Sequence, residues 1–269
     1  MPALERDGHD VVRVTRDAGG ELDAAALSGA DAVVHLAGEG VADKRWTPEQ
    51  KQRVLESRTG GTSLVANTIA GLSRPPKVLL SSSAIGYYGN RGDEVLTEES
   101  SAGAGFLADV CVQWEAATAP AEAAGIRVAH LRTGIVVGKT GGAVAKTLRL
   151  FKLGLGGRIG SGKQYWSWIS LTDEIGATRF LLDHDVSGPV NLTGPNPVTN
   201  AEFTKAVGRA LHRPTVIPVP KFGPRLLLGR EAADEVVSAS QRVEPVVLAR
   251  AGYRFAHPTV DDAVTAELA

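Results

Sequence analysis

The residues with the clearest chemical potential follow a short apolar run. Val78-Leu79-Leu80 leads into three serines, Ser81 to Ser83, and then into two phenols, Tyr87 and Tyr88. A continuous apolar run of this kind is typical of a buried parallel strand. Ligands of doubly wound sheets bind beyond the carboxyl ends of such strands. We therefore predict that Ser83 hydrogen-bonds a carbonyl or alcohol oxygen, the alternative being a strand end that satisfies only local backbone groups.

The elements that must position these residues alternate along the chain. A Thr N-cap, a proline at the first helical position and Gln50 predict that a helix begins at Pro48. The alternation predicts an α/β fold with a doubly wound parallel sheet and a smaller C-terminal α/β lobe. Strands are expected at residues 11–14, 31–36, 77–83, 126–131 and 188–193, and helices at residues 48–72, 105–124 and 200–211, with another that begins at Thr172.

Composition limits the classes of protein that fit. The net charge of the 269 residues is −1, so no global field attracts nucleic acid or anionic lipid. The single cysteine excludes a disulfide within the chain and suits a reducing cytosol. No apolar run approaches the roughly 20 residues needed to span a bilayer, and the six histidines lack metal-ligand spacing. We expect a cytoplasmic protein with a small-molecule substrate, no nucleic acid or membrane partner and no metal, as a monomer or a homodimer.

Several short motifs occur in a characteristic order. They are Gly8-His9, His35-Leu36-Ala37-Gly38-Glu39, Lys44-Arg45-Trp46, Ser57-Arg58, Gly61-Thr62, the Ser81–Gly89 stretch, Cys111-x-x-Trp114-Glu115, Leu131-Arg132-Thr133-Gly134, Trp168-Ile169, Asn191-Leu192-Thr193 and Pro218-Val219-Pro220. Together they resemble the atypical, epimerase-like branch of the extended short-chain dehydrogenase/reductase superfamily, often described as NAD-dependent epimerase/dehydratase or nucleoside-diphosphate-sugar epimerase. The resemblance implies a Rossmann-like domain over residues 1–215, in which residues 140–170 contribute to the substrate lobe, and a small C-terminal domain over 216–269.

The resemblance also implies a nicotinamide cofactor. Arg16 follows the strand expected at residues 11–14, which corresponds to the second strand of a complete Rossmann-like domain. NADP-binding proteins place an arginine there, so we favour NADP, with NAD as the alternative. Asp17 beside it leaves a solvated surface arginine equally open. The expected cofactor contacts are Arg16, Leu36, Ala37, Gly38, Glu39, Ser57, Arg58, Ser81, Ser82, Thr133, Gly134 and Ile135.

Two usual parts of such a site do not occur in this sequence. A Rossmann-like domain begins with a strand and a glycine-rich turn that binds the pyrophosphate, and residues 2–9 resemble instead the end of the helix that follows that turn. We expect Met1 to be an internal or misassigned start, with roughly 20 residues and the first strand absent. The superfamily's Tyr-x-x-x-Lys pair is the second part, and Cys111 and Glu115 stand at its spacing. Since a carboxylate raises the pKa of a neighbouring acid, the usual mechanism does not carry over.

Other groups could complete the site. Tyr87 is a candidate to replace the lost base, although a packed tyrosine is equally open. Expected substrate contacts are Tyr88, Cys111, Arg158, Gln164 and Trp166, because cations, amides and an indole suit phosphates and sugars. A buried inert thiol is the favoured alternative for Cys111, and packing is the alternative for the tryptophan.

These observations predict an NAD(P)-dependent oxidoreductase or epimerase that acts on an unknown carbonyl or sugar-nucleotide-type substrate, with Ser83 and Tyr87 as catalytic residues. Two alternatives remain: a non-catalytic NADP-binding sensor or partner-binding protein, and an inactive truncated product.

Overall fold

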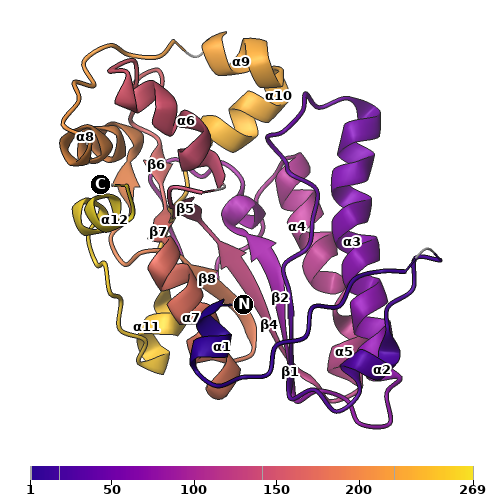
Figure 1. Cartoon of the computed structure of the whole chain (residues 1–269). Helices are drawn as coiled ribbons and strands as arrows, with labels where there is room; N and C mark the ends of the chain where they lie inside the picture. The colour runs from indigo at the N-terminus through magenta and orange to yellow at the C-terminus, as the bar shows by residue number, and fades with distance from the viewer. Residues whose placement is uncertain (1, 18, 141, 221, 269) are drawn as a thin grey trace.

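The computed structural model describes residues 2–17, 19–140, 142–220 and 222–268. Its centre is a four-stranded parallel sheet in the order β1-β2-β4-β8 (Figure 1). The strands are β1 (Ala32–His35), β2 (Val78–Ala84), β4 (Arg127–Thr133) and β8 (Gly188–Leu192). The predicted doubly wound parallel sheet is confirmed, and its strands rest on the apolar runs expected from the sequence.

Helices cover both faces of this sheet, as a doubly wound fold requires. On one face, Leu79 and Val128 pack beneath α2 (Ala24–Leu27), α3 (Pro48–Ala70) and α5 (Ala119–Ala123), and α4 (Phe106–Ala116) continues this layer. On the other face, Leu80 and Leu131 pack against α7 (Leu171–Asp183) and α11 (Val246–Ala251). The two faces alternate along each strand because successive side chains point in opposite directions.

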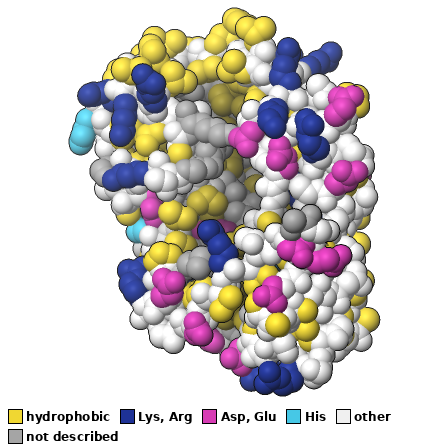
Figure 2. All heavy atoms as spheres, turned by 45° about the vertical axis from the view of Figure 1, so that its right-hand side comes forward, with side chains coloured by type: hydrophobic (Ala, Val, Ile, Leu, Met, Phe, Trp, Pro, Cys, Tyr) yellow, Lys and Arg dark blue, Asp and Glu magenta, His cyan; other side chains and the backbone are white. Residues whose placement is uncertain are grey.

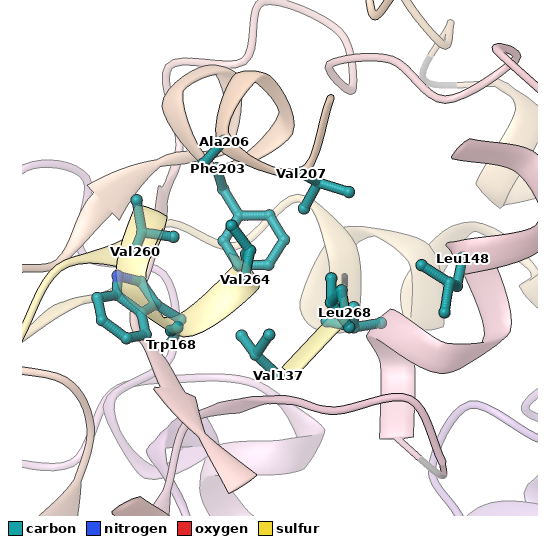
Figure 3. Close-up of a cluster of buried hydrophobic side chains, with 11 residues drawn as sticks. Val137, Leu148, Trp168, Phe203, Ala206, Val207, Val260, Val264 and Leu268 are labelled. Carbon is teal, nitrogen blue, oxygen red and sulfur yellow. The ribbon is translucent and has the colours of Figure 1, made fainter. Parts of the chain in front are cut away.

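A second lobe adjoins the carboxyl ends of the strands. Its core includes Val137, Leu148, Trp168, Phe203 and Val264, which converge in Figure 3. These side chains come from β5 (Ile135–Val137), α6 (Gly142–Lys152), β7 (Trp168–Ser170), α8 (Asn200–Ala210) and α12 (Val260–Leu268). The boundary predicted at residue 215 stays a prediction, since this lobe uses segments from both sides of it.

Short elements complete the described chain. They are α1 (Pro2–Arg6), a 3₁₀ turn η1 (Ile85–Tyr88), β3 (Val95–Leu96), β6 (Tyr165–Trp166), β9 (Val198–Thr199), α9 (Phe222–Leu228), α10 (Arg230–Ala232), a π-helical turn η2 (Ala233–Val237) and β10 (Arg242–Val243). β3 pairs with β10, β5 with β7, and β6 with β9. No helix among the described residues is long and apolar enough to cross a membrane.

Two expected elements differ from the structure. The strand predicted at residues 11–14 is wrong, because these residues form no β pairing and only nearby Arg16 forms an isolated bridge, with Leu22. A strand needs a paired neighbour, and the described segment joins no sheet. The single helix predicted from 105 to 124 is instead α4 and α5, separated at Ala117–Thr118 just before Pro120. A proline lacks the backbone N–H that a continuous helix would use there.

Candidate functional site

Three polar side chains form a row across the carboxyl half of the sheet. Ser83 of β2 is in register with Arg132 of β4, and Arg132 is in register with Asn191 of β8. All three are buried. Paired residues of neighbouring strands point to the same face of a sheet. The register therefore places a hydroxyl, a guanidinium and an amide side by side under α4 and η1, a group we call the polar row.

Glu115 of α4 joins this row through both carboxylate oxygens. Arg132 donates from Nε to Oε1 and from Nη2 to Oε2, each over 2.8 Å. Ser83 Oγ donates to Oε1 over 2.7 Å. Burial alone would lower the pKa of Arg132, but its hydrogen bonds to Glu115 and the charge of that carboxylate raise it well above its usual range. Arg132 and Glu115 therefore form a bidentate, charge-assisted ion pair that is almost completely buried.

The phenol of Tyr88 extends the row towards β8. Its hydroxyl accepts a hydrogen bond from Arg132 Nη1 over 3.0 Å and donates one to Asn191 Oδ1 over 2.7 Å. The side chain is fully buried, and burial raises the pKa of Tyr88. Because this hydroxyl is already engaged on both sides, the predicted substrate contact by Tyr88 is not supported by its position.

Tyr87 is placed differently from its neighbour. Its side chain is half-buried, and its hydroxyl makes no hydrogen bond with the described residues. The guanidinium carbon of Arg132 lies 3.4 Å from the centre of its ring, and the Tyr88 ring meets it edge-on. Tyr87 therefore combines a phenol with an adjacent fixed cation.

Cys111 lies behind the 3₁₀ turn. Its thiol is buried and contacts the carbonyl oxygen of Ala84 at 3.7 Å. Burial, aided by the negative charge of Glu115, raises the pKa of Cys111 to about 12. The protonated, covered thiol agrees with the inert alternative and speaks against the predicted substrate contact.

The predicted cofactor residues after β1 do come together. Ser57 Oγ accepts a hydrogen bond from the amide of Glu39 over 3.0 Å, and Arg58 Nη1 donates to the carbonyl oxygen of Glu39 over 2.9 Å. A Cβ on Gly38 would lie 3.4 Å from the Arg58 guanidinium. Thus α3 fixes the backbone of the loop that contains Leu36, Ala37, Gly38 and Glu39, and the Leu36 side chain stays exposed.

Arg16 approaches the same region from the N-terminal segment. Its Nη2 atom would lie 3.0 Å from a Cβ on Gly61, and His35 Nε2 would lie 3.9 Å from it. Burial, followed by the charge of Arg16, lowers the pKa of His35. His35 is in register with Ser81, and both His35 Nε2 and Ser81 Oγ are buried without a partner among the described residues. This pair offers two unused polar atoms, while Ser82 points to the opposite face.

Thr133, Gly134 and Ile135 leave β4 for the second lobe. Thr133 Oγ1 donates to Glu174 Oε1 over 2.8 Å, and burial raises the pKa of Glu174 to about 7. A Cβ on Gly134 would clash with the carbonyl oxygen of Ser167. The need for glycine there comes from the protein's own backbone, so it does not by itself indicate a bound ring.

Family models match most of the chain, including the segments that form the polar row. The model of the NAD dependent epimerase/dehydratase family matches residues 2–193, and a domain of unknown function, DUF1731, matches residues 219–267. The chain belongs to the NAD-dependent epimerase/dehydratase family.

Relatives of this epimerase family member cover nearly its full length. It is 45% identical to epimerase family protein Mb2239 of Mycobacterium bovis over 97% of this chain and 90% of that protein. The crystal structure of human epimerase family protein SDR39U1 with NADPH has a TM-score of 0.90 and 32% identity, and the match covers 99% of this chain and 93% of that chain. A nucleoside-diphosphate sugar epimerase from Corynebacterium glutamicum has a TM-score of 0.77 and 36% identity, over 98% of this chain and 54% of that one.

The remaining predicted substrate residues of this epimerase family member lie in the second lobe. Gln164 is buried and its Nε2 donates to the carbonyl oxygen of Ile159, while Trp166 packs edge-on against Phe203. Arg158 is exposed and donates to the carbonyl oxygen of Gly160. None of the three contacts the polar row within the described residues, so the structure does not unite them with Ser83.

Sequence reasoning missed several members of the site. Arg132 lies in the motif Leu131-Arg132-Thr133-Gly134, but nothing in the spacing of that motif showed that Arg132 would bind Glu115. Glu235 accepts hydrogen bonds from the amides of Phe106 and Leu107 and so caps α4 from a distant segment. Gln241 Nε2 donates to the carbonyl oxygen of Ile85 over 2.9 Å and so holds the 3₁₀ turn. Only the register of β2 and β4 could have signalled Arg132.

Proposed function

We propose that this protein is an NADP-dependent oxidoreductase or epimerase that acts on a hydroxyl or carbonyl group of a small molecule, with a sugar nucleotide as one candidate class. The observation that carries the proposal is the polar row with Glu115, located where the family's sites lie. Ser83 would orient the reacting oxygen, and Tyr87 would exchange its proton.

The bonding of Ser83 decides what it offers to a ligand. The Glu115 carboxylate, held by Arg132, can only accept hydrogen bonds, so the single hydroxyl proton of Ser83 points to it. The lone pairs of Ser83 Oγ then remain to accept a bond from a substrate hydroxyl. Ser83 is therefore better prepared to orient an alcohol than to polarise a carbonyl, which refines the sequence prediction.

Tyr87 is the phenol available for proton transfer. Its hydroxyl has no competing partner among the described residues, unlike that of Tyr88. The Arg132 guanidinium on its ring is a fixed positive charge, of the kind that stabilises negative charge developing on an oxygen during proton transfer. Arg132 would thus stand in for the missing lysine, while Glu115 holds it in position.

The residues present fit a dinucleotide cofactor. The buried, unpartnered His35 Nε2 and Ser81 Oγ are polar atoms that a ligand could satisfy, and Arg16 of the N-terminal segment, Gly38 of the loop after β1, and Ser57 and Arg58 of α3 lie close by. When bound, NADP supplies or accepts the hydride. Support for NADP over NAD comes from Arg16 and from the human relative's structure with NADPH.

A non-catalytic cofactor-binding sensor is the second candidate. Its support is that Glu115, Arg132, Tyr88 and Asn191 satisfy one another without a ligand. Such a network can be retained for structural reasons alone. An inactive product stays a further alternative.

Calorimetric titration with NADPH, followed by turnover assays on a panel of carbonyls and sugar nucleotides, tests these candidates. We expect binding and turnover, and we expect Ser83→Ala and Tyr87→Phe to bind NADPH normally while turnover falls by about 10² to 10⁴. Binding without turnover on any substrate would favour the sensor. Turnover unchanged in Ser83→Ala would refute the assignment of that residue.

A further inference from the structure

Exposed hydrophobic side chains gather on one part of the second lobe. Leu153, Val216, Phe222, Leu226 and Leu227 are 64%, 84%, 70%, 73% and 74% exposed. Figure 2 shows hydrophobic side chains concentrated along the top of the molecule, over the region of α6 and α9. Scattered apolar residues are normal on a surface, but a contiguous group marks a place of interaction. The full set is Leu150, Leu153, Leu155, Val216, Ile217, Phe222, Leu226 and Leu227.

Backbone contacts make this group continuous. The amide of Val219 donates to the carbonyl oxygen of Arg158 over 2.8 Å, and the amide of Gly160 donates to the carbonyl oxygen of Val219 over 2.9 Å. Arg213 Nε donates to the carbonyl oxygen of Lys152 over 2.8 Å. The end of α6 and the segment after it therefore lie beside residues 213–219, and α9 begins three residues further on.

Charge in these segments is of one sign. Residues 134–172 contain six Lys or Arg and no Asp or Glu, and residues 203–230 contain six and none. This leaves 17 of the 29 basic residues, but all 30 acidic ones, in the rest of the chain. The net charge of −1 conceals this separation, which is why composition alone gave no reason to expect an anionic partner.

Many of these cations are free to attract a partner. Arg149, Lys152, Arg158, Lys163 and Lys205 are exposed and form no ion pair with the described residues. Arg209 and Arg225 differ, since they pair with Asp261 and Asp234. A surplus of unpaired positive charge therefore surrounds the apolar group.

A basic hollow lies directly beside the apolar side chains. It has a volume of about 660 Å³, and its lining includes Lys205, Arg209, His212, Arg213 and Pro214. Pro214 is two residues from Val216, so the hollow and the apolar group are neighbours. We call the two together the basic–apolar face.

We propose that the basic–apolar face docks on the surface of a membrane that contains anionic phospholipids. Apolar side chains would enter the boundary of the acyl chains, as in peripheral proteins that lie on a bilayer. Lys and Arg would face the headgroups, and the hollow could receive a headgroup phosphate. A second copy seated face to face is disfavoured, because it would bring the unpaired cations of both copies together.

Vesicle flotation of the full-length chain tests this proposal without reference to catalysis. We expect binding to vesicles of phosphatidylcholine with phosphatidylserine, about tenfold or more above binding to phosphatidylcholine alone, and a decrease as salt rises. Lys152→Glu with Lys205→Glu should remove this preference, and Leu226→Asp with Leu227→Asp should also reduce binding about tenfold. Lys77→Glu and Val12→Asp, which alter exposed residues elsewhere, are the matched controls and should bind like the unaltered chain.

Each other outcome would overturn the proposal. The proposal would be overturned if the chain bound neither kind of vesicle, or if it bound vesicles with and without phosphatidylserine equally. Dimerisation in light scattering that the Leu226→Asp and Leu227→Asp pair abolishes, without vesicle binding, would show a contact between copies. Full displacement by inorganic phosphate, with the aspartate pair binding normally, would show only an anion site. Circular dichroism of every variant establishes that it is folded.

Discussion

In the polar row every side chain has a polar partner, whereas beside it, where His35 of β1 pairs with Ser81 of β2, two buried polar atoms have none. Ser83, Arg132 and Asn191 are bonded through Glu115 and Tyr88. His35 Nε2 and Ser81 Oγ lack partners among the described residues. A buried polar group without a partner costs about 1–3 kcal/mol of stability. The row therefore needs no ligand to satisfy its polar groups, while the pair of His35 and Ser81 gains from a ligand that supplies the missing bonds.

The largest expected effect comes from breaking the polar row. Arg132→Met should lower the free energy of unfolding by about 3–5 kcal/mol, because it leaves the Glu115 carboxylate buried without its counter-charge. Urea denaturation measures this loss. Arg149→Met, on the exposed side of α6, is the matched control and should change stability by less than about 0.5 kcal/mol. A loss as small as the control's would show that the folded state does not depend on Arg132 to compensate the Glu115 carboxylate.

The buried carboxyl of Glu174 should make stability depend on pH. Its pKa is raised to about 7 in the folded chain, so between its unfolded value and about 7 the folded state binds more protons. Stability should therefore fall as pH rises through this window and level off above it. Glu174→Gln should remove this part of the decline, on the order of 1–3 kcal/mol at pH 8. Parallel stability curves for the two chains across the window would contradict the expectation.

The two adjacent tyrosines provide a sharper comparison. Tyr88→Phe should cost about 1–3 kcal/mol, because Arg132 Nη1 and Asn191 Oδ1 each lose a partner in a buried place. Tyr87→Phe should change stability by less than about 0.5 kcal/mol, since its hydroxyl has no described partner. Thermal or urea unfolding distinguishes them. Equal losses would mean that the Tyr87 hydroxyl is also bonded in the folded protein.

The last comparison concerns two serines of β2. Ser81→Ala removes a buried oxygen that has no described partner, so the free energy of unfolding should stay the same or rise by up to about 1–3 kcal/mol, whereas Ser83→Ala should lower it by about 1 kcal/mol. In titrations with NADPH the order should reverse, with Ser81→Ala weakening affinity and Ser83→Ala leaving it unchanged. Normal NADPH affinity in Ser81→Ala would remove Ser81 from the proposed cofactor site.

Local patterns were sufficient for much of the fold. The cap at Thr47 is present as predicted, and the helix expected from residue 200 begins there with a capping box of Thr199 and Glu202, because each of these starts depends on residues within one helical turn. The start predicted for α7 at Thr172 was one residue too late, because Ser170 is the N-cap and the helix begins at Leu171. The prediction of a strand at residues 11–14 was wrong, because a strand depends on a pairing partner that local sequence does not reveal.

The site was less predictable from sequence. Ser83 and Tyr87 could be proposed from their position after a buried strand, and Arg58 and Ser57 from motifs. The roles of Arg132, Asn191, Glu235 and Gln241 depend on contacts between segments far apart in the chain. Tyr87 and Tyr88 also have the same residue type, and only burial distinguishes a free phenol from a structural one.

The sequence by itself indicated the family, the parallel strands and the presence of Cys111 and Glu115 where the resemblance expects a Tyr and a Lys, because these follow from residue types, their order along the chain and the resemblance that they carry. Tertiary structure alone decided what the replacement does. Strand register places Arg132 beside Ser83 and opposite Glu115, which turns an unfavourable lone carboxylate into a paired one. Such pairing depends on geometry across the sheet, where Coulomb energy and burial depend on distance in space and not on distance along the chain.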